Sequence, residues 1–198
     1  MVVVLKTTVP KGAKGSNPLP SLTNTNNGDM DMDFRKTTEI ARLFAEKKHK
    51  GQLYGKDPYT KHLSDAAKIA REFELGEFIE TAVWLHDTLE DTDTKLIDLI
   101  SHFSTEIAQV VMAVTDVPAD KRDRRAKKTL PKIYDAGATA VAVKLCDRIA
   151  NVEASAKVPH KLKMYKKEQD FFKQSLYRVE DKLDPLWDRL ENAISKGC

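Results

Sequence analysis

The chain has 198 residues, of which 41% are hydrophobic and 32% are charged, and its formal net charge is +3. One soluble globular domain with a sizeable core is the natural expectation. So small a charge gives no reason to expect nucleic acid or a membrane surface as a partner, and no apolar run approaches a membrane span. Cys146 and Cys198 do not form the pattern of a disulfide framework, so we expect a reducing, cytoplasmic setting.

Residues 1–33 differ from the rest of the chain, because Pro, Gly, Asn, Ser and Thr dominate them and they offer little to bury. This composition predicts a disordered tail. The alternative is an arm that docks on a partner. We expect one domain over residues 34–198, with its core at about 34–155 and C-terminal helices at about 160–196.

From Phe34 onward, apolar residues recur at helical spacing, which predicts helices within residues 40–47, 63–70, 79–86, 96–100 and 107–114. The charged segment 162–179 is typical of a surface helix, and residues 186–194 predict a last one. Residues 138–147, ATAVAVKLCD, alternate β-branched and small side chains as a strand does. No other segment reads clearly as a strand, so a buried helix that overrides propensity is the better interpretation.

In the stretch WLHDTLEDT, several titratable residues directly follow an apolar segment that is typical of a buried helix. A single helix over residues 81–91 would place Glu90 one turn beyond His86. An imidazole and a carboxylate from His86 and Asp87 would make half of a metal site. A metal would also offset the cost of holding carboxylates beside an apolar core.

Two further ligands are available in other segments. His62 lies in PYTKH after the turn dipeptide Asp57-Pro58, and Asp147 ends the apolar run AVAVKLCD. Each signal is weak alone, because an HD dipeptide arises often by chance and a single histidine is usually a satisfied core or surface group. The order H…HD…D and the sequences around each member carry the prediction.

The segments AEKKHKGQLYGKDPYTKH, AVWLHDTLEDTDT and VKLCDRIANV, with that order, resemble the HD superfamily of metal-dependent phosphohydrolases. They are similar to the hydrolase domain of RelA/SpoT homologues, and specifically to the small single-domain alarmone hydrolases, over about residues 34–155. The resemblance implies an all-α HD-domain fold, helical also at 138–147. It implies a metal, typically Mn²⁺, on four ligands: His62, His86, Asp87 and Asp147. From ligand types alone, Mn, Fe, Zn and Co all stay open.

The same resemblance implies that Glu90 and Asp91 are the catalytic acidic pair and that Asn151 contacts substrate. A divalent metal lowers the pKa of bound water toward neutrality, and Glu90 would orient or deprotonate that water while Asp91 assists. The alternative for the two acids is a solvated helix end. The helix dipole disfavours acids there, so a nearby cation would be needed.

The chain departs from the family pattern where the base is recognised. Relatives commonly carry an Arg-Lys pair after the HKGQ motif, in which Lys50 is a candidate substrate contact. In this chain Tyr54 occupies the position of that arginine, and Lys56 takes the place of the lysine. Tyr54 could stack on a purine but cannot make the same cation–π and fork contacts as the arginine. A second departure is Glu153, where many relatives have arginine. An adenine alarmone or a shorter pGpp-like substrate therefore stays open beside guanine.

The segment KRDRRAKK, residues 121–128, is rich in positive charge. It is interpreted either as a solvated helix face or as a polyphosphate clamp with contacts from Arg124 and Lys128. Lys144 and Arg148, which flank the last ligand, are further candidates. Nucleic acid is disfavoured because the net charge is balanced. The lysines of residues 157–173 predict an exposed helix face.

The resemblance, with these residues, implies metal-dependent removal of the 3′-pyrophosphate from (p)ppGpp-like nucleotides, with release of pyrophosphate. The alternatives are an HD-type 5′-nucleotidase or other phosphomonoesterase, an adenine-alarmone hydrolase acting as an antitoxin, and a non-catalytic alarmone or nucleic acid binding module. The expected partner is a small purine nucleotide, with no membrane. The sequence does not indicate an oligomeric state.

Overall fold

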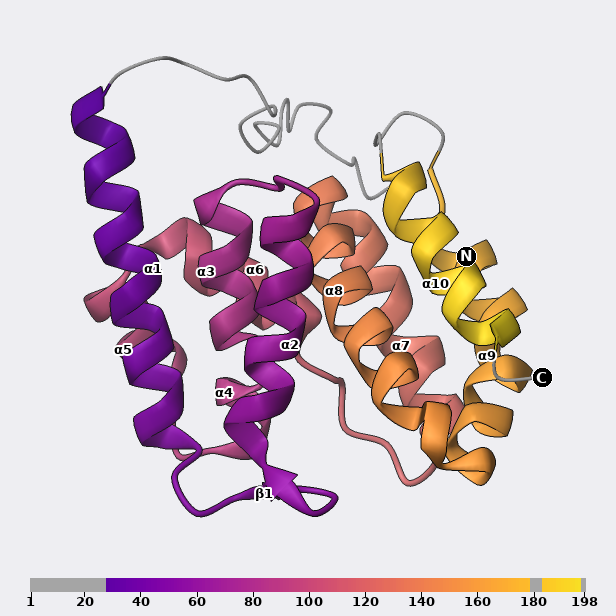
Figure 1. Ribbon diagram of the computed structural model, residues 1–198. Helices are drawn as coiled ribbons and strands as arrows, with labels where there is room; N and C mark the ends of the chain where they lie inside the picture. The colour runs from indigo at the N-terminus through magenta and orange to yellow at the C-terminus, as the bar shows by residue number, and fades with distance from the viewer. Residues whose placement is uncertain (1–27, 179–182, 197–198) are drawn as a thin grey trace, which may run out of the picture.

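The computed structural model describes residues 28–178 and 183–196, with side chains from residue 36 onward. Helices dominate it, as expected, and a two-stranded hairpin joins the first two (Figure 1). The first elements are α1 (Gly28–Lys48), β1 (Leu53–Tyr54), β2 (Asp57–Pro58), α2 (Tyr59–Glu72), α3 (Glu77–Leu85), α4 (Thr88–Asp91) and α5 (Leu96–His102). They are followed by α6 (Thr105–Val114), α7 (Arg122–Ala136), α8 (Ala138–Ala154), the 3-10 turn η1 (Ser155–Lys157), α9 (Pro159–Leu176) and α10 (Asp184–Lys196).

Helix α8 lies at the centre of the fold and packs against α2, α3, α6, α7 and α10. In Figure 1 it stands between α2 and α10. The ambiguous segment 138–147 is its first half, so the helix interpretation is confirmed. Small and β-branched side chains suit a helix with neighbours on nearly every side, because they let other helices approach closely. Val141, Val143 and Leu145 are almost fully buried.

The stretch WLHDTLEDT does not form the single helix expected over residues 81–91. Helix α3 ends at Leu85, and α4 begins only at Thr88. Asp87 has φ −96° and ψ −3°, which lies in the bridge region at the edge of regular α-helical geometry. The Thr88 hydroxyl donates to the carbonyl of Leu85 at 2.7 Å and so satisfies the helix end. The break lets the side chains of His86 and Asp87 point inward together, while Glu90 lies in the next turn, within α4.

The start of the chain is only partly described. Helix α1 begins at Gly28, ahead of the expected start of helical structure at Phe34. The predicted tail lies mostly outside the described residues, and so does Cys198, whereas Cys146 is buried with a free thiol. The tail and the domain boundary therefore stay predictions. Among the described residues, every helix is too short or too polar to cross a lipid bilayer.

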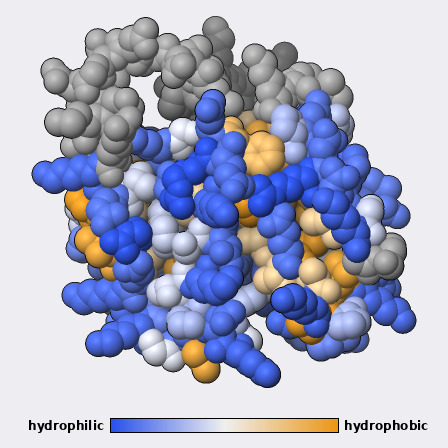
Figure 2. All heavy atoms as spheres, viewed as in Figure 1, coloured by the Kyte–Doolittle hydropathy of each residue, from blue (hydrophilic) through white to orange (hydrophobic). Residues whose placement is uncertain are grey.

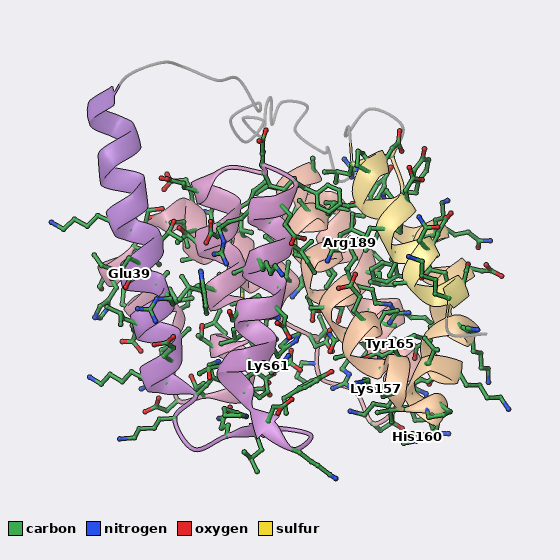
Figure 3. The ribbon with its side chains drawn as sticks, in the orientation of Figure 1. Glu39, Lys61, Lys157, His160, Tyr165 and Arg189 are labelled. Atoms are coloured by element: carbon green, nitrogen blue, oxygen red, sulfur yellow. The ribbon has the colours of Figure 1, made fainter. Side chains whose placement is uncertain are left out.

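Charged and polar side chains cover most of the face drawn in Figure 2, with apolar patches between them. The C-terminal helix α10 docks on the core through Leu186 and Leu190, both buried. Arg189, labelled in Figure 3, donates to Glu153 of α8 at 2.8 Å. It also pairs with Glu72 of α2, so one guanidinium ties three helices together.

Candidate metal centre and active site

The four predicted ligands converge from three segments of the chain. His62 lies in the first turns of α2, His86 and Asp87 form the break between α3 and α4, and Asp147 lies in the middle of α8. The Nε2 atom of His62 is 3.6 Å from Asp87 Oδ2 and 3.4 Å from Asp147 Oδ1. The Nε2 atom of His86 is 3.0 Å and 3.6 Å from the same two oxygens. Both imidazoles therefore face both carboxylates.

The tautomer of His86 suits metal binding. Its Nδ1 lies 2.7 Å from the carbonyl oxygen of Val83, which can only accept, so Nδ1 carries the proton. In the neutral ring that a metal requires, the lone pair of Nε2 would therefore face Asp87 and Asp147. This nitrogen is buried and makes no hydrogen bond with any residue that the structure describes. A cation bound here would satisfy it, as metal-ligating histidines commonly hold their other nitrogen on a carbonyl.

The electrostatics of the centre favour added positive charge. Burial raises the pKa of Asp147, but Lys144 and the imidazoles of His62 and His86 outweigh it and hold that pKa well below its usual value. Burial lowers the pKa of His86, yet the two carboxylates hold it well above normal. His62, His86 and Asp87 form a group whose ligand atoms all lie within 4.8 Å of one another. This donor set of two imidazoles and two carboxylates fits a divalent transition metal.

Tyr59, which the sequence analysis missed, joins a predicted ligand to the acidic pair. Its hydroxyl lies 2.7 Å from Asp87 Oδ2 and 2.7 Å from Asp91 Oδ2. Its ring stacks on His49 at a centroid distance of 4.7 Å, and Gln52 Nε2 donates to the Asp91 carbonyl at 2.6 Å. The motif PYTKH could have indicated that Tyr59 belongs to the site, because Tyr59 precedes His62 by one helical turn and so shares its face of the helix.

Glu90 points from α4 toward the α6–α7 connection. Its Oε2 accepts a hydrogen bond from the backbone N–H of Asp116 at 3.0 Å. Its side chain is one-third exposed, at 33%. Burial, and then the negative charges of Asp116 and Asp87, raise the pKa of Glu90. Such a carboxylate holds a proton more readily than an exposed one, which suits proton transfer.

Tyr54 lies directly over the metal centre. Its ring stacks on His62 at 4.9 Å between centroids, with 15° between the planes. Its hydroxyl donates to Asn151 Oδ1, and Asn151 Nδ2 in turn donates to Asp147 Oδ1. Lys144 Nζ donates to the other Asp147 oxygen at 2.8 Å. The structure therefore brings these three predicted substrate residues to the centre.

Helix α9 also lies beside Tyr54, and nothing in the sequence indicated this contact. Lys161 Nζ lies 5.1 Å from the Tyr54 ring centroid. Tyr165, labelled in Figure 3, is buried on the side of α9 that faces α8. No motif signalled either residue, because a lysine-rich amphipathic helix reads as an exposed face until its partner is known.

The other predicted substrate residues lie elsewhere. Arg148 is buried, donates to Glu168 Oε2 at 2.9 Å and lies over the ring of Tyr165, so its guanidinium joins α8 to α9. Arg124 pairs with Asp120 at 2.6 Å on the exposed face of α7. Glu153 binds Arg189 of α10 and no residue of the metal centre. Lys50, Lys56 and Lys128 are exposed. Substrate contacts of these cationic residues stay predictions.

The fold and this centre define an HD-domain protein. The family model described as "HD domain" matches residues 41–174, more than half of the chain, and the chain belongs to this family. It is 37% identical over 119 residues to the Danio rerio guanosine-3′,5′-bis(diphosphate) 3′-pyrophosphohydrolase MESH1, covering 55% of this chain and 63% of that protein. The Homo sapiens MESH1 is 32% identical over 115 residues, covering 55% and 64%. The predicted resemblance to small alarmone hydrolases is confirmed.

A solved structure shares the fold. It was described as a metazoan ortholog of SpoT that hydrolyzes ppGpp. It matches with a TM-score of 0.70 and 20% identity, over 81% of this chain and 94% of that one. At this identity the likeness concerns the fold alone. The matched region spans less than two thirds of each of these two MESH1 proteins.

Proposed function

We propose that the protein hydrolyses the 3′-pyrophosphate of a (p)ppGpp-like nucleotide and releases pyrophosphate, with Mn²⁺ as the metal. The convergence of two imidazoles and two carboxylates beside Glu90 carries this proposal. The pyrophosphohydrolase names of the relatives support the substrate class.

The proposed roles follow from position. His62, His86, Asp87 and Asp147 would hold the metal, which when bound supplies a more acidic water and offsets phosphate charge. Glu90 would take a proton from the attacking water and deliver it to the ribose 3′ oxygen as the bond between that oxygen and phosphorus breaks. Asp91, held by Tyr59, would assist. Lys144 and Asn151 would place the phosphates.

The base is the open part of the proposal. Tyr54 offers a flat ring beside the metal centre, with Lys161 over it, where the family pattern has an arginine. Stacking on a tyrosine does not distinguish guanine from adenine strongly. An adenine alarmone is therefore a second candidate, and an antitoxin role would be one setting for it.

A substrate panel tests the function. We expect purified protein with Mn²⁺ to release pyrophosphate from at least one of ppGpp, pGpp and pppApp, and to lose this activity on chelation and regain it with Mn²⁺. Inorganic phosphate from a nucleoside monophosphate would instead support the phosphomonoesterase alternative. No turnover on all three alarmones, with metal shown to be bound, would contradict the proposal.

A further inference from the structure

One arginine of the basic segment 121–128 turns toward the candidate active site. Arg125 Nε lies 3.1 Å from Asp116 Oδ2, and its Nη1 lies 3.9 Å from Glu90 Oε1. Its side chain is 36% exposed, compared with 58% for the neighbouring Arg124. The clamp and solvated-face interpretations of this segment do not account for an arginine that bridges two carboxylates.

Arg125 lies on the face of α7 that binds the connection between α6 and α7. Thr129 follows it by four residues and Lys132 by seven, so all three lie on one face. The Thr129 hydroxyl accepts from the backbone N–H of Val117 at 2.9 Å, and Lys132 Nζ donates to the carbonyl of Thr115 at 2.6 Å. Residues 115–117 are thus attached to α7 at three consecutive positions.

This attachment fixes a donor for Glu90. The N–H of Asp116 donates to Glu90 Oε2, while Arg125 approaches Oε1, so each carboxylate oxygen has its own partner. Helix α4, which carries Glu90, has only four residues. We propose that Arg125 is a positioning residue, which holds Glu90 in its working orientation directly and through Asp116. This inference rests on the proposed function, in which Glu90 handles the proton of the attacking water.

Steady-state kinetics separates positioning from substrate binding. We expect Arg125→Met to lower kcat roughly 10- to 100-fold with KM little changed, because a misplaced catalytic group costs rate more than affinity. Arg125→Lys should recover part of the loss. Lys127→Met removes an exposed charge two residues along the same helix and should behave as wild type. A raised KM with unchanged kcat in Arg125→Met would mean a polyphosphate clamp and overturn the proposal.

A double-mutant cycle makes the test specific to Glu90. If Arg125 acts through Glu90, adding Arg125→Met to Glu90→Gln should cause almost no further loss of kcat, because residues that act as a unit are not additive. Additive losses would overturn the proposal.

The amide resonance of Asp116 tests the contact without substrate. Its ¹H–¹⁵N shift should change in Arg125→Met and in Glu90→Ala and stay in place in Lys127→Met, while the rest of the spectrum shows a folded protein. A wild type that releases no pyrophosphate would count against the proposed function. An Asp116 amide unmoved by Arg125→Met would count against this inference.

Discussion

We expect replacement of Asp87 with alanine to abolish retention of Mn²⁺ and, with it, the proposed release of pyrophosphate. Asp87 Oδ2 is the oxygen that approaches both imidazoles, at 3.0 Å from His86 and 3.6 Å from His62. Loss of a group that only supports a metal ligand typically costs about 10- to 100-fold in affinity, so loss of a ligand should exceed that. Isothermal titration with Mn²⁺ and metal analysis of the purified variant measure it.

The matched control is Asp93→Ala. Asp93 is six residues further along the chain, its side chain is 86% exposed, and it pairs with Lys48 at 2.8 Å. Its removal takes away the same charge near the same site and should leave Mn²⁺ binding and turnover unchanged. Wild-type Mn²⁺ affinity in Asp87→Ala would remove Asp87 from the ligand set.

Glu90→Gln should keep the metal and lose most of the turnover. The amide still accepts from the N–H of Asp116 but can no longer take a proton from water. Loss of a general acid or base typically costs about 10²- to 10⁴-fold, so we expect kcat to fall by that amount with Mn²⁺ affinity unchanged. Pyrophosphate release under saturating substrate, with parallel Mn²⁺ titration, measures both.

Glu39→Gln serves as the control for this change. Glu39 lies on α1, remote from the metal centre, and its exposed carboxylate binds Arg42 (Figure 3). Its substitution should not alter kcat. If Glu90→Gln turned over near the wild-type rate, the proton would have to be handled by another group, and Asp91 would be the next residue to substitute.

The sequence was sufficient to select the residues that meet at the centre. His62, His86, Asp87 and Asp147 were chosen from local motifs and their order, and the folded chain brings their side chains together. Helical periodicity predicted most of the described helices. For residues 138–147, propensity alone favoured a strand, and only the lack of a pairing segment and the family resemblance pointed to α8.

What the sequence did not reveal depends on contacts between distant segments. The break at His86–Asp87 has no glycine or proline to mark it in the sequence. The position of Tyr54 on His62 depends on the hairpin, whose strands have two residues each. Lys161 and Arg125 lie in lysine- and arginine-rich helices, where composition alone does not distinguish an inward side chain from its exposed neighbours.

Diffraction from crystals grown with Mn²⁺, measured on both sides of the Mn absorption edge, tests the metal centre most directly. We expect one strong anomalous peak, bonded to Nε2 of His62 and of His86 and to a carboxylate oxygen from each of Asp87 and Asp147. A Mn²⁺ peak at another place, or one that leaves His62 and Asp147 outside its ligands, would contradict the proposed centre and the hydrolysis that depends on it.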